Sequence, residues 1–145
     1  MVMDSMTRRQ RSRHMSQIRV SGTQPELAMR KIVRELTDFS PKYNVKNLVG
    51  KPDIIIPDLK LAVFVDGCFW HGCLEHGKIP KSHQGFWRSK IVQNMIRDEE
   101  NVVILEEDGW SVWRVWEHDL RPETVAKTRR RLGRKMMKII GLLNS

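Results

Sequence analysis

Apolar residues recur at helical spacing in three parts of this chain. A first helix is predicted to begin after Thr23, because Thr23 and Glu26 form a capping box and Pro25 is tolerated in a first turn. Its apolar side chains are Met29, Ile32, Val33 and Leu36, and the helix is expected to end before Ser40-Pro41. Two further helices are predicted over residues 86–101 and 122–143.

Short apolar runs between these helices predict four strands. They cover residues 43–49, 54–56, 61–65 and 110–116. A turn at residues 57–60 separates the second strand from the third. The order is therefore helix, three strands, helix, strand and helix, which predicts an α/β domain with a sheet flanked by helices.

The turn at residues 57–60 also predicts where Asp53 lies. If it closes an antiparallel hairpin, Ile56 pairs near Leu61. Asp53 then lies opposite Phe64 or Val65, at the far end of the third strand. This pairing brings an acidic side chain next to the segment that follows that strand.

Charge and length narrow the class of protein. The 145 residues fit one domain, and a formal net charge of +9 favours a nucleic-acid partner, with a ribosomal or merely soluble basic protein as the alternative. We predict a basic arm over residues 1–20, for which a solvated tail is the alternative, and one domain over residues 21–145. No apolar run approaches a membrane span and no signal-peptide pattern is present, so we expect a cytoplasmic, nucleoid-associated protein.

The segment after the third predicted strand combines two thiols with imidazoles. Cys68, Cys73 and His76 have a spacing that suits tetrahedral zinc on a tight loop. For the fourth ligand we favour His118 over His83 and His14, which adjoining structure constrains less. Two buried thiols or a Cys68–Cys73 disulfide are the alternatives.

Acidic residues and one remaining histidine suggest hydrolysis of a phosphodiester. That reaction needs a hard cation held by carboxylates and a base that activates water. Asp53 is the first candidate ligand for magnesium, although a turn could also satisfy it. Glu26 either completes the capping box or faces the metal through a water. His71 is the candidate base, and the alternative is that it binds zinc in place of His76.

Two further groups of side chains suggest contact with nucleic acid. Trp87, Lys90, Asn94 and Asp98 share a face of the second predicted helix, which faces either solvent or phosphate and metal-bound water. Phe69-Trp70 places adjacent aromatic rings on a loop, where they either pack in the core or wedge between base steps. Trp110, Trp113 and Trp116 are assigned to the core.

These residues together resemble the very-short-patch repair (Vsr) endonucleases. The motifs that carry the resemblance are Lys51-Pro52-Asp53, the run from Val63 to Cys73, Phe86-Trp87, Asn94 with Arg97-Asp98, and Gly109-Trp110 with Val115-Trp116-Glu117. The resemblance extends from about Thr7 to the final helix, and the D-G-C-F-W-H-G-C run is its most specific part.

The resemblance implies a restriction-endonuclease-like fold with a zinc-stapled loop. It also implies an enzyme that nicks one strand of double-stranded DNA beside T:G mismatches, which arise from deamination of 5-methylcytosine. A MutL-type repair factor and a cognate cytosine methyltransferase would act in the same pathway, and the enzyme would be a monomer.

The resemblance also implies a role for each site residue. Asp53 and the backbone carbonyl of Val65 would bind Mg²⁺, His71 would be the base, and Glu26 and Asp98 would hold metal-bound waters. Phe69 and Trp70 would form the wedge, with Met15 entering from the other groove. Zn²⁺ would be bound by Cys68, Cys73, His76 and His118.

Three positions depart from the family pattern. His118 stands where the family usually has cysteine, and Val65 stands where better-known members have threonine. The acid-x-Lys that restriction-type nucleases carry after the first aspartate is also lacking, so His71 must do the work of that lysine. Two other functions stay open: a Vsr-like nuclease with a different target, such as a mobile-element or defence enzyme, and a zinc-stapled DNA-binding module without activity.

Overall fold

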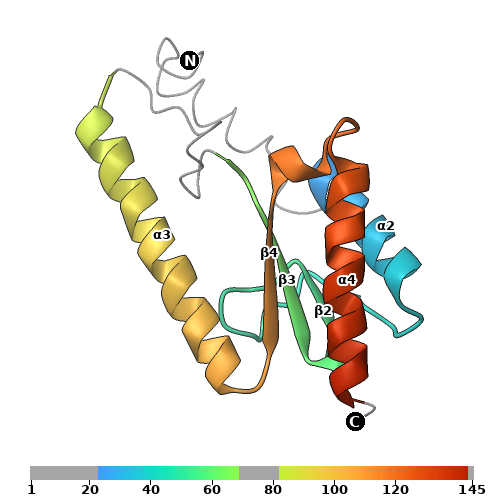
Figure 1. Cartoon of the computed structure of the whole chain (residues 1–145). Helices are drawn as coiled ribbons and strands as arrows, with labels where there is room; N and C mark the ends of the chain where they lie inside the picture. The colour runs from blue at the N-terminus through green and yellow to red at the C-terminus, as the bar shows by residue number, and fades with distance from the viewer. Residues whose placement is uncertain (1–22, 69–81, 144–145) are drawn as a thin grey trace.

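The computed structural model describes residues 23–68 and 82–143 of the chain (Figure 1). Its elements are α2 (Gln24–Leu36), β1 (Lys42–Tyr43), β2 (Ile54–Ile56), η2 (Pro57–Leu59), β3 (Leu61–Asp66), α3 (Gln84–Glu107), β4 (Ser111–Trp116), η3 (Glu117–Leu120) and α4 (Val125–Leu143). The predicted order of helices and strands is confirmed. The predicted basic arm lies outside the described residues.

The four strands form one mixed sheet in the order β1-β2-β3-β4. β2 pairs with β3 as an antiparallel hairpin in which Ile56 lies opposite Leu61, as predicted. β3 and β4 are parallel, and Asp66 lies opposite Trp116 at their carboxyl ends. Helix α3 makes the crossover that a parallel pair requires, so it connects the carboxyl end of β3 to the start of β4.

Helices cover both faces of the sheet. Helices α2 and α4 pack on one face and α3 stands against the other (Figure 1). The core beneath α2 and α4 contains these buried side chains: Met29, Ile32, Val33, Ile54, Ile56, Leu61, Val63, Trp113, Val115, Leu132 and Met136. A smaller cluster on the α3 side contains Ile55, Ala62, Phe64 and Leu105.

The first helix begins as its sequence predicts. The Thr23 hydroxyl accepts a hydrogen bond from the Glu26 backbone N–H at 3.4 Å. Pro25 lies in the first turn, where a missing N–H costs nothing. The predicted apolar stripe is also confirmed, because Met29, Ile32 and Val33 are buried against the sheet.

The first predicted strand is mostly wrong. Residues 43–49 were expected to be extended, but β1 ends at Tyr43. Asn44 turns into the left-handed region with φ 51°, where a strand cannot continue. Gly50 has φ 78°, a conformation that strains other residues, and a Cβ there would lie only 3.1 Å from the Phe64 ring.

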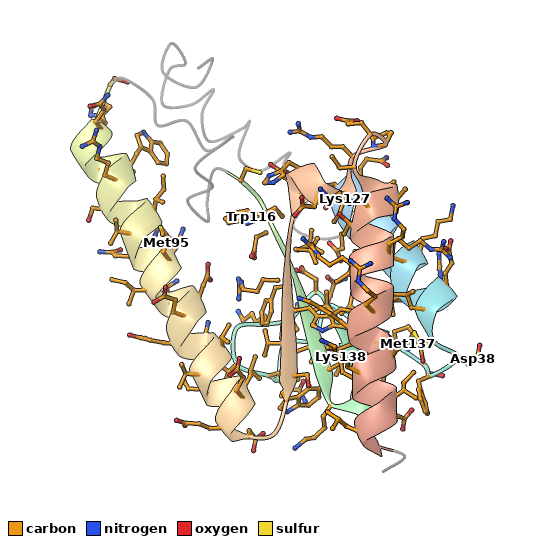
Figure 2. The ribbon with its side chains drawn as sticks, in the orientation of Figure 1. Asp38, Met95, Trp116, Lys127, Met137 and Lys138 are labelled. Carbon is orange, nitrogen blue, oxygen red and sulfur yellow. The ribbon has the colours of Figure 1, made fainter. Side chains whose placement is uncertain are left out.

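Other boundaries and one packing assignment also differ. α3 runs on to Glu107, beyond the predicted end at residue 101, whereas β4 begins at Ser111 and α4 at Val125. Trp113 is buried as predicted and Trp110 packs against the smaller cluster, but Trp116 is only partly buried and belongs to neither cluster. Trp116 lies on the α3 side of β4 (Figure 2), where strand alternation directs it away from the main core. Among the described residues, no helix is long and apolar enough to cross a membrane.

Candidate active site and metal-ligand pair

The hairpin brings Asp53 to the carboxyl end of β3. The Asp53 backbone N–H donates to the Val63 carbonyl at 3.0 Å, so the pairing of β2 with β3 continues to Asp53. Its Oδ2 accepts a hydrogen bond from the Val65 backbone N–H at 2.7 Å. The Asp53 side chain is therefore held beside Val65, which lies one residue before Asp66 and three residues before Cys68.

Glu26 approaches the same region from α2 and is 2% exposed. Its Oε1 accepts a hydrogen bond from Arg30 at 2.8 Å. In the amide orientation that satisfies both partners, the Asn44 side-chain nitrogen donates to Glu26 Oε1 at 2.9 Å and its oxygen accepts from Arg30 at 3.1 Å. Asn44 also donates its backbone N–H to the Asp53 carbonyl at 3.0 Å, so Glu26 is coupled to the Asp53 backbone through one residue.

The predicted polar face of α3 divides into two parts. Asn94 and Asp98 line a cavity of about 500 Å³ together with Gly50, Lys51, Arg97 and Asn101. Trp87 is partly buried on the same side of the helix, and its ring meets Phe86 edge to face at 5.1 Å. Lys90 is exposed instead. Asn94 and Asp98 thus line a partly open cavity, whereas Lys90 faces solvent.

Lys51 also lines this cavity, and no separate role was predicted for it. It has a left-handed backbone with φ 52°, which is uncommon for a residue other than glycine. Such a conformation persists only where surrounding structure imposes it, and such positions often cluster at functional sites. Two positions from Asp53, Lys51 brings a positive charge to the cavity that Asp98 lines.

The ion pair between Arg114 and Asp66 was not predicted from the sequence. Arg114 donates from Nε and Nη2 to the two carboxylate oxygens of Asp66, at 2.9 and 2.8 Å. The same Nη2 lies 3.4 Å from Asp98 Oδ1. Strand alternation could have revealed the pair, because Phe64, Asp66 and Arg114 occupy the α3 face of β3 and β4.

The ends of β3 and β4 also bring together two predicted zinc ligands. Cys68 Sγ lies 3.2 Å from His118 Nδ1, and Cys68 is 2% exposed. The other ring nitrogen, Nε2, lies 3.6 Å from Asp119 Oδ1. A carboxylate beside the second nitrogen orients many metal-binding histidines, so a soft sulfur and an oriented imidazole fit zinc chemistry here.

Glu117 strengthens the connection between these strand ends. Its Oε1 accepts a hydrogen bond from the Cys68 backbone N–H at 3.1 Å. The Trp116 and His118 rings are nearly parallel, with centroids 6.2 Å apart. Side chains after β4 therefore hold the chain where it leaves β3.

Several predicted site residues lie outside the described residues. They are Met15, Phe69, Trp70, His71, Cys73 and His76. Within residues 23–68 and 82–143, no group of three or more His, Cys, Asp and Glu side chains is arranged to hold a metal ion. The described part brings Cys68 to His118, Asp53 to Val65, and Asp66 to Asp98 through Arg114.

This arrangement of side chains at the carboxyl end of β3 suits phosphate chemistry. Carboxylates from three elements meet the carboxyl end of β3, and Lys51 and Arg97 supply positive charge in the adjoining cavity. Carboxylate oxygens suit a hard divalent cation, whereas cationic side chains suit phosphate oxygens.

Known proteins with similar sequences agree with this chemistry. Residues 3–76 match the family described as DNA mismatch endonuclease Vsr. A type II nicking enzyme of Lentzea aerocolonigenes, V.NaeI, is 40% identical over 121 residues, which cover 80% of this chain and 72% of that protein. Another, V.NmeAIP of Neisseria meningitidis serogroup A, is 39% identical over 127 residues, covering 87% and 90% respectively.

The DNA mismatch endonuclease Vsr of Escherichia coli is 34% identical over 115 residues, which cover 77% of this chain and 71% of that protein. The mixed sheet flanked by helices fits the same family of nucleases. The matched family and relatives therefore share an enzymatic class, hydrolysis of a DNA phosphodiester. The chain belongs to the Vsr family of DNA endonucleases.

Proposed function

We propose that this enzyme is a magnesium-dependent endonuclease that nicks one strand of duplex DNA beside a T:G mismatch, the product of 5-methylcytosine deamination. The observation that carries the proposal is the 2.7 Å hydrogen bond from the Val65 N–H to Asp53 Oδ2. It holds a carboxylate at the strand end from which the D-G-C-F-W-H-G-C segment continues. This hydrogen bond supports a cation site at Asp53, and the candidate base His71 follows Val65 by six residues in the sequence.

Asp53 and the backbone carbonyl of Val65 would hold Mg²⁺. When bound, the cation would polarise the scissile phosphate and offset negative charge that develops as the bond breaks. His71 accepts a proton from the attacking water, whose oxygen bonds to phosphorus while the bond to the leaving sugar oxygen breaks. Glu26 and Asp98 would orient water molecules at that site.

Recognition of the duplex would use aromatic and cationic side chains. Phe69 and Trp70 wedge between base steps, and Met15, within the arm of residues 1–20, enters from the opposite groove. Trp87, Lys90 and Asn94 contact the backbone from α3. The net charge of +9 supplies the electrostatic attraction that any such complex needs.

A structural zinc ion would join the segment after β3 to the end of β4. Cys68, Cys73, His76 and His118 are the proposed ligands, and the 3.2 Å approach of Cys68 Sγ to His118 Nδ1 supports two of them. The ion would supply folding energy by closing this segment. The enzyme acts as a monomer, with residues 21–145 as one domain, and a MutL-type factor and a cytosine methyltransferase are its pathway partners.

A different mismatch context or target is the second candidate. It is favoured by the relatives V.NaeI and V.NmeAIP, which are named as type II nicking enzymes. Such a protein would use the same cation and base at another sequence. The two candidates therefore differ in the DNA that is recognised and not in the hydrolysis.

A nicking assay across duplexes tests the proposal. With Mg²⁺, we expect a T:G duplex to be nicked on one strand and a matched T:A duplex to be left intact, and His71→Ala to abolish nicking. The assay is repeated in several methylated and unmethylated sequence contexts. Equal nicking of T:A and T:G would remove mismatch specificity, and tight binding without nicking in any context would leave only a DNA-binding module.

The zinc assignment has its own measurement. We expect one equivalent of zinc in the purified protein by elemental analysis, and a reduced zinc content together with a lower thermal midpoint in Cys68→Ser and His118→Ala. His83→Ala is the control, since its side chain is exposed where α3 begins. Zinc retained in His118→Ala but lost in His83→Ala would reverse the choice of fourth ligand.

A further inference from the structure

We propose that Arg114 is a positioning residue that takes the place of a cation between Asp66 and Asp98. Its planar guanidinium meets both oxygens of Asp66 and reaches Asp98 with the same Nη2, at 2.8 and 3.4 Å. The three side chains come from β4, β3 and α3. Arg114 therefore joins the sheet to the helix that carries Asp98.

The surroundings of Arg114 hold the guanidinium in one orientation. Its Cζ lies 4.4 Å from the centroid of the Phe64 ring, a cation–π distance. The Asp66 side chain is 8% exposed and receives two parallel hydrogen bonds from Arg114. A bidentate pair over an aromatic ring uses geometry that lysine cannot reproduce.

Burial explains why this position needs a positive charge. Asp66 and Asp98 both approach the point occupied by Nη2, and two carboxylates around one point form a site that a hard divalent cation can occupy. Arg114 Nη2 occupies that point. A cation is thereby directed to Asp53, whose carboxylate is held separately by the Val65 N–H.

The contact with Arg114 also restrains Asp98. Its side chain lines the cavity shared with Lys51 and Asn94, and the Arg114 contact restrains it there from the sheet side. This part of the inference rests on the proposed function, in which Asp98 orients water. Supporting partners of a metal site contribute about 10- to 100-fold to its activity or affinity.

Three forms of the full chain test the inference. They are Arg114→Gln, the double variant Asp66→Asn/Arg114→Gln, and Arg129→Gln as the matched control. Arg129 also pairs with an acid, with its Nε 2.6 Å from Glu35 Oε2, but this pair joins α4 to α2 on the opposite side of the sheet. Each form is assayed for Mn²⁺ bound without DNA by electron paramagnetic resonance, for thermal midpoint, and for single-turnover nicking with Mg²⁺.

We expect Arg114→Gln to bind one more Mn²⁺ than the wild type, to melt at a lower temperature and to nick about 10- to 100-fold more slowly. The double variant should lose the extra Mn²⁺ and recover most of the thermal midpoint, because the buried Asp66 carboxylate is gone. Its nicking should stay slow, since Asp98 lacks the contact with Arg114. Arg129→Gln should match the wild type in Mn²⁺ binding and nicking.

Two outcomes would overturn the inference. If the double variant recovers full nicking with its stability, Arg114 acts only by satisfying Asp66. If Arg114→Gln binds no additional Mn²⁺, the guanidinium does not replace a cation. A wild type that nicks no duplex would instead defeat the proposed function, while the Mn²⁺ counts would still support or overturn the role of Arg114.

Discussion

The two faces of the sheet are built from the same strands but carry different kinds of side chain. On the α2 and α4 face, Val63, Val115 and Leu132 belong to one apolar core and are at most 1% exposed. On the α3 face, the apolar cluster around Phe64 gives way to Asp66 and Arg114 toward the carboxyl ends of the strands. Two residues along β3, from Phe64 to Asp66, the environment on this face therefore changes from hydrocarbon to ion pair.

The two faces therefore contribute differently to the free energy of folding. The α2 and α4 face removes large apolar side chains from water, which is the dominant favourable term in folding. The α3 face supports carboxylates whose mutual repulsion is offset by Arg114, an arrangement that adds little net stability. The first face is expected to determine whether the chain folds, and the second whether it cuts DNA.

The largest expected effect on the α3 side comes from Asp53→Asn. The amide oxygen still accepts from the Val65 N–H, so thermal stability should change little, but loss of a cation ligand should slow nicking by about 1,000-fold. Single-turnover kinetics with Mg²⁺ measures the rate. Asp58→Asn, in the exposed turn between β2 and β3, is the control and should nick normally. A rate within tenfold of the wild type would exclude Asp53 as a cation ligand.

On the opposite face, Leu132→Ala should reduce stability and leave activity unchanged. Leu132 is 1% exposed within the core under α4, so its truncation should lower the free energy of unfolding by about 2 to 5 kcal/mol. Urea unfolding measures the loss, and nicking per folded molecule should be unchanged. The matched control is Val103→Ala on α3, whose side chain is 53% exposed and whose loss should cost within about 0.5 kcal/mol. Equal losses in both variants would contradict the assignment of the core.

Asp98→Asn tests whether the cavity on the α3 side belongs to the active site. Its side chain is 23% exposed, so we expect a small change in unfolding free energy but nicking slower by about 10- to 100-fold. Glu99→Gln, one residue along the same helix and exposed, serves as the control. If both variants nick at the wild-type rate, the cavity lined by Asp98 is not part of the active site.

The smallest effect is expected from Thr23→Ala at the start of α2. Loss of the hydroxyl that accepts from the Glu26 N–H should lower the free energy of unfolding by about 1 kcal/mol. Thr23→Ser retains the acceptor and should restore most of it. A nicking defect larger than the loss of stability would indicate that the cap also positions Glu26, and would connect the two faces of the sheet.

Local patterns in the sequence predicted much of the fold. The capping box, the apolar stripe of α2 and the hairpin register are all confirmed, because each depends on neighbours within a few residues. The strand predicted over residues 43–49 is wrong because the positive φ of Asn44 and Gly50 depends on how this loop packs. Gly50 in particular accommodates Phe64, a residue of β3 that no local pattern connects to it.

The candidate site shows the same division. Residue types and spacing made Asp53 a candidate cation ligand and His118 a candidate partner of Cys68, and the resemblance to the Vsr family implied a nuclease. The contacts of Arg114 and the place of Lys51 in the cavity were not predicted, and the tertiary structure established them. Parallel pairing of β3 with β4 places Arg114 beside Asp66, and the loop before Asp53 places Lys51 near Asp98. The sequence determines which chemical groups the chain contains and their order along it. Long-range pairing determines which charged groups lie close enough to interact, because Coulomb interactions depend on distance in space.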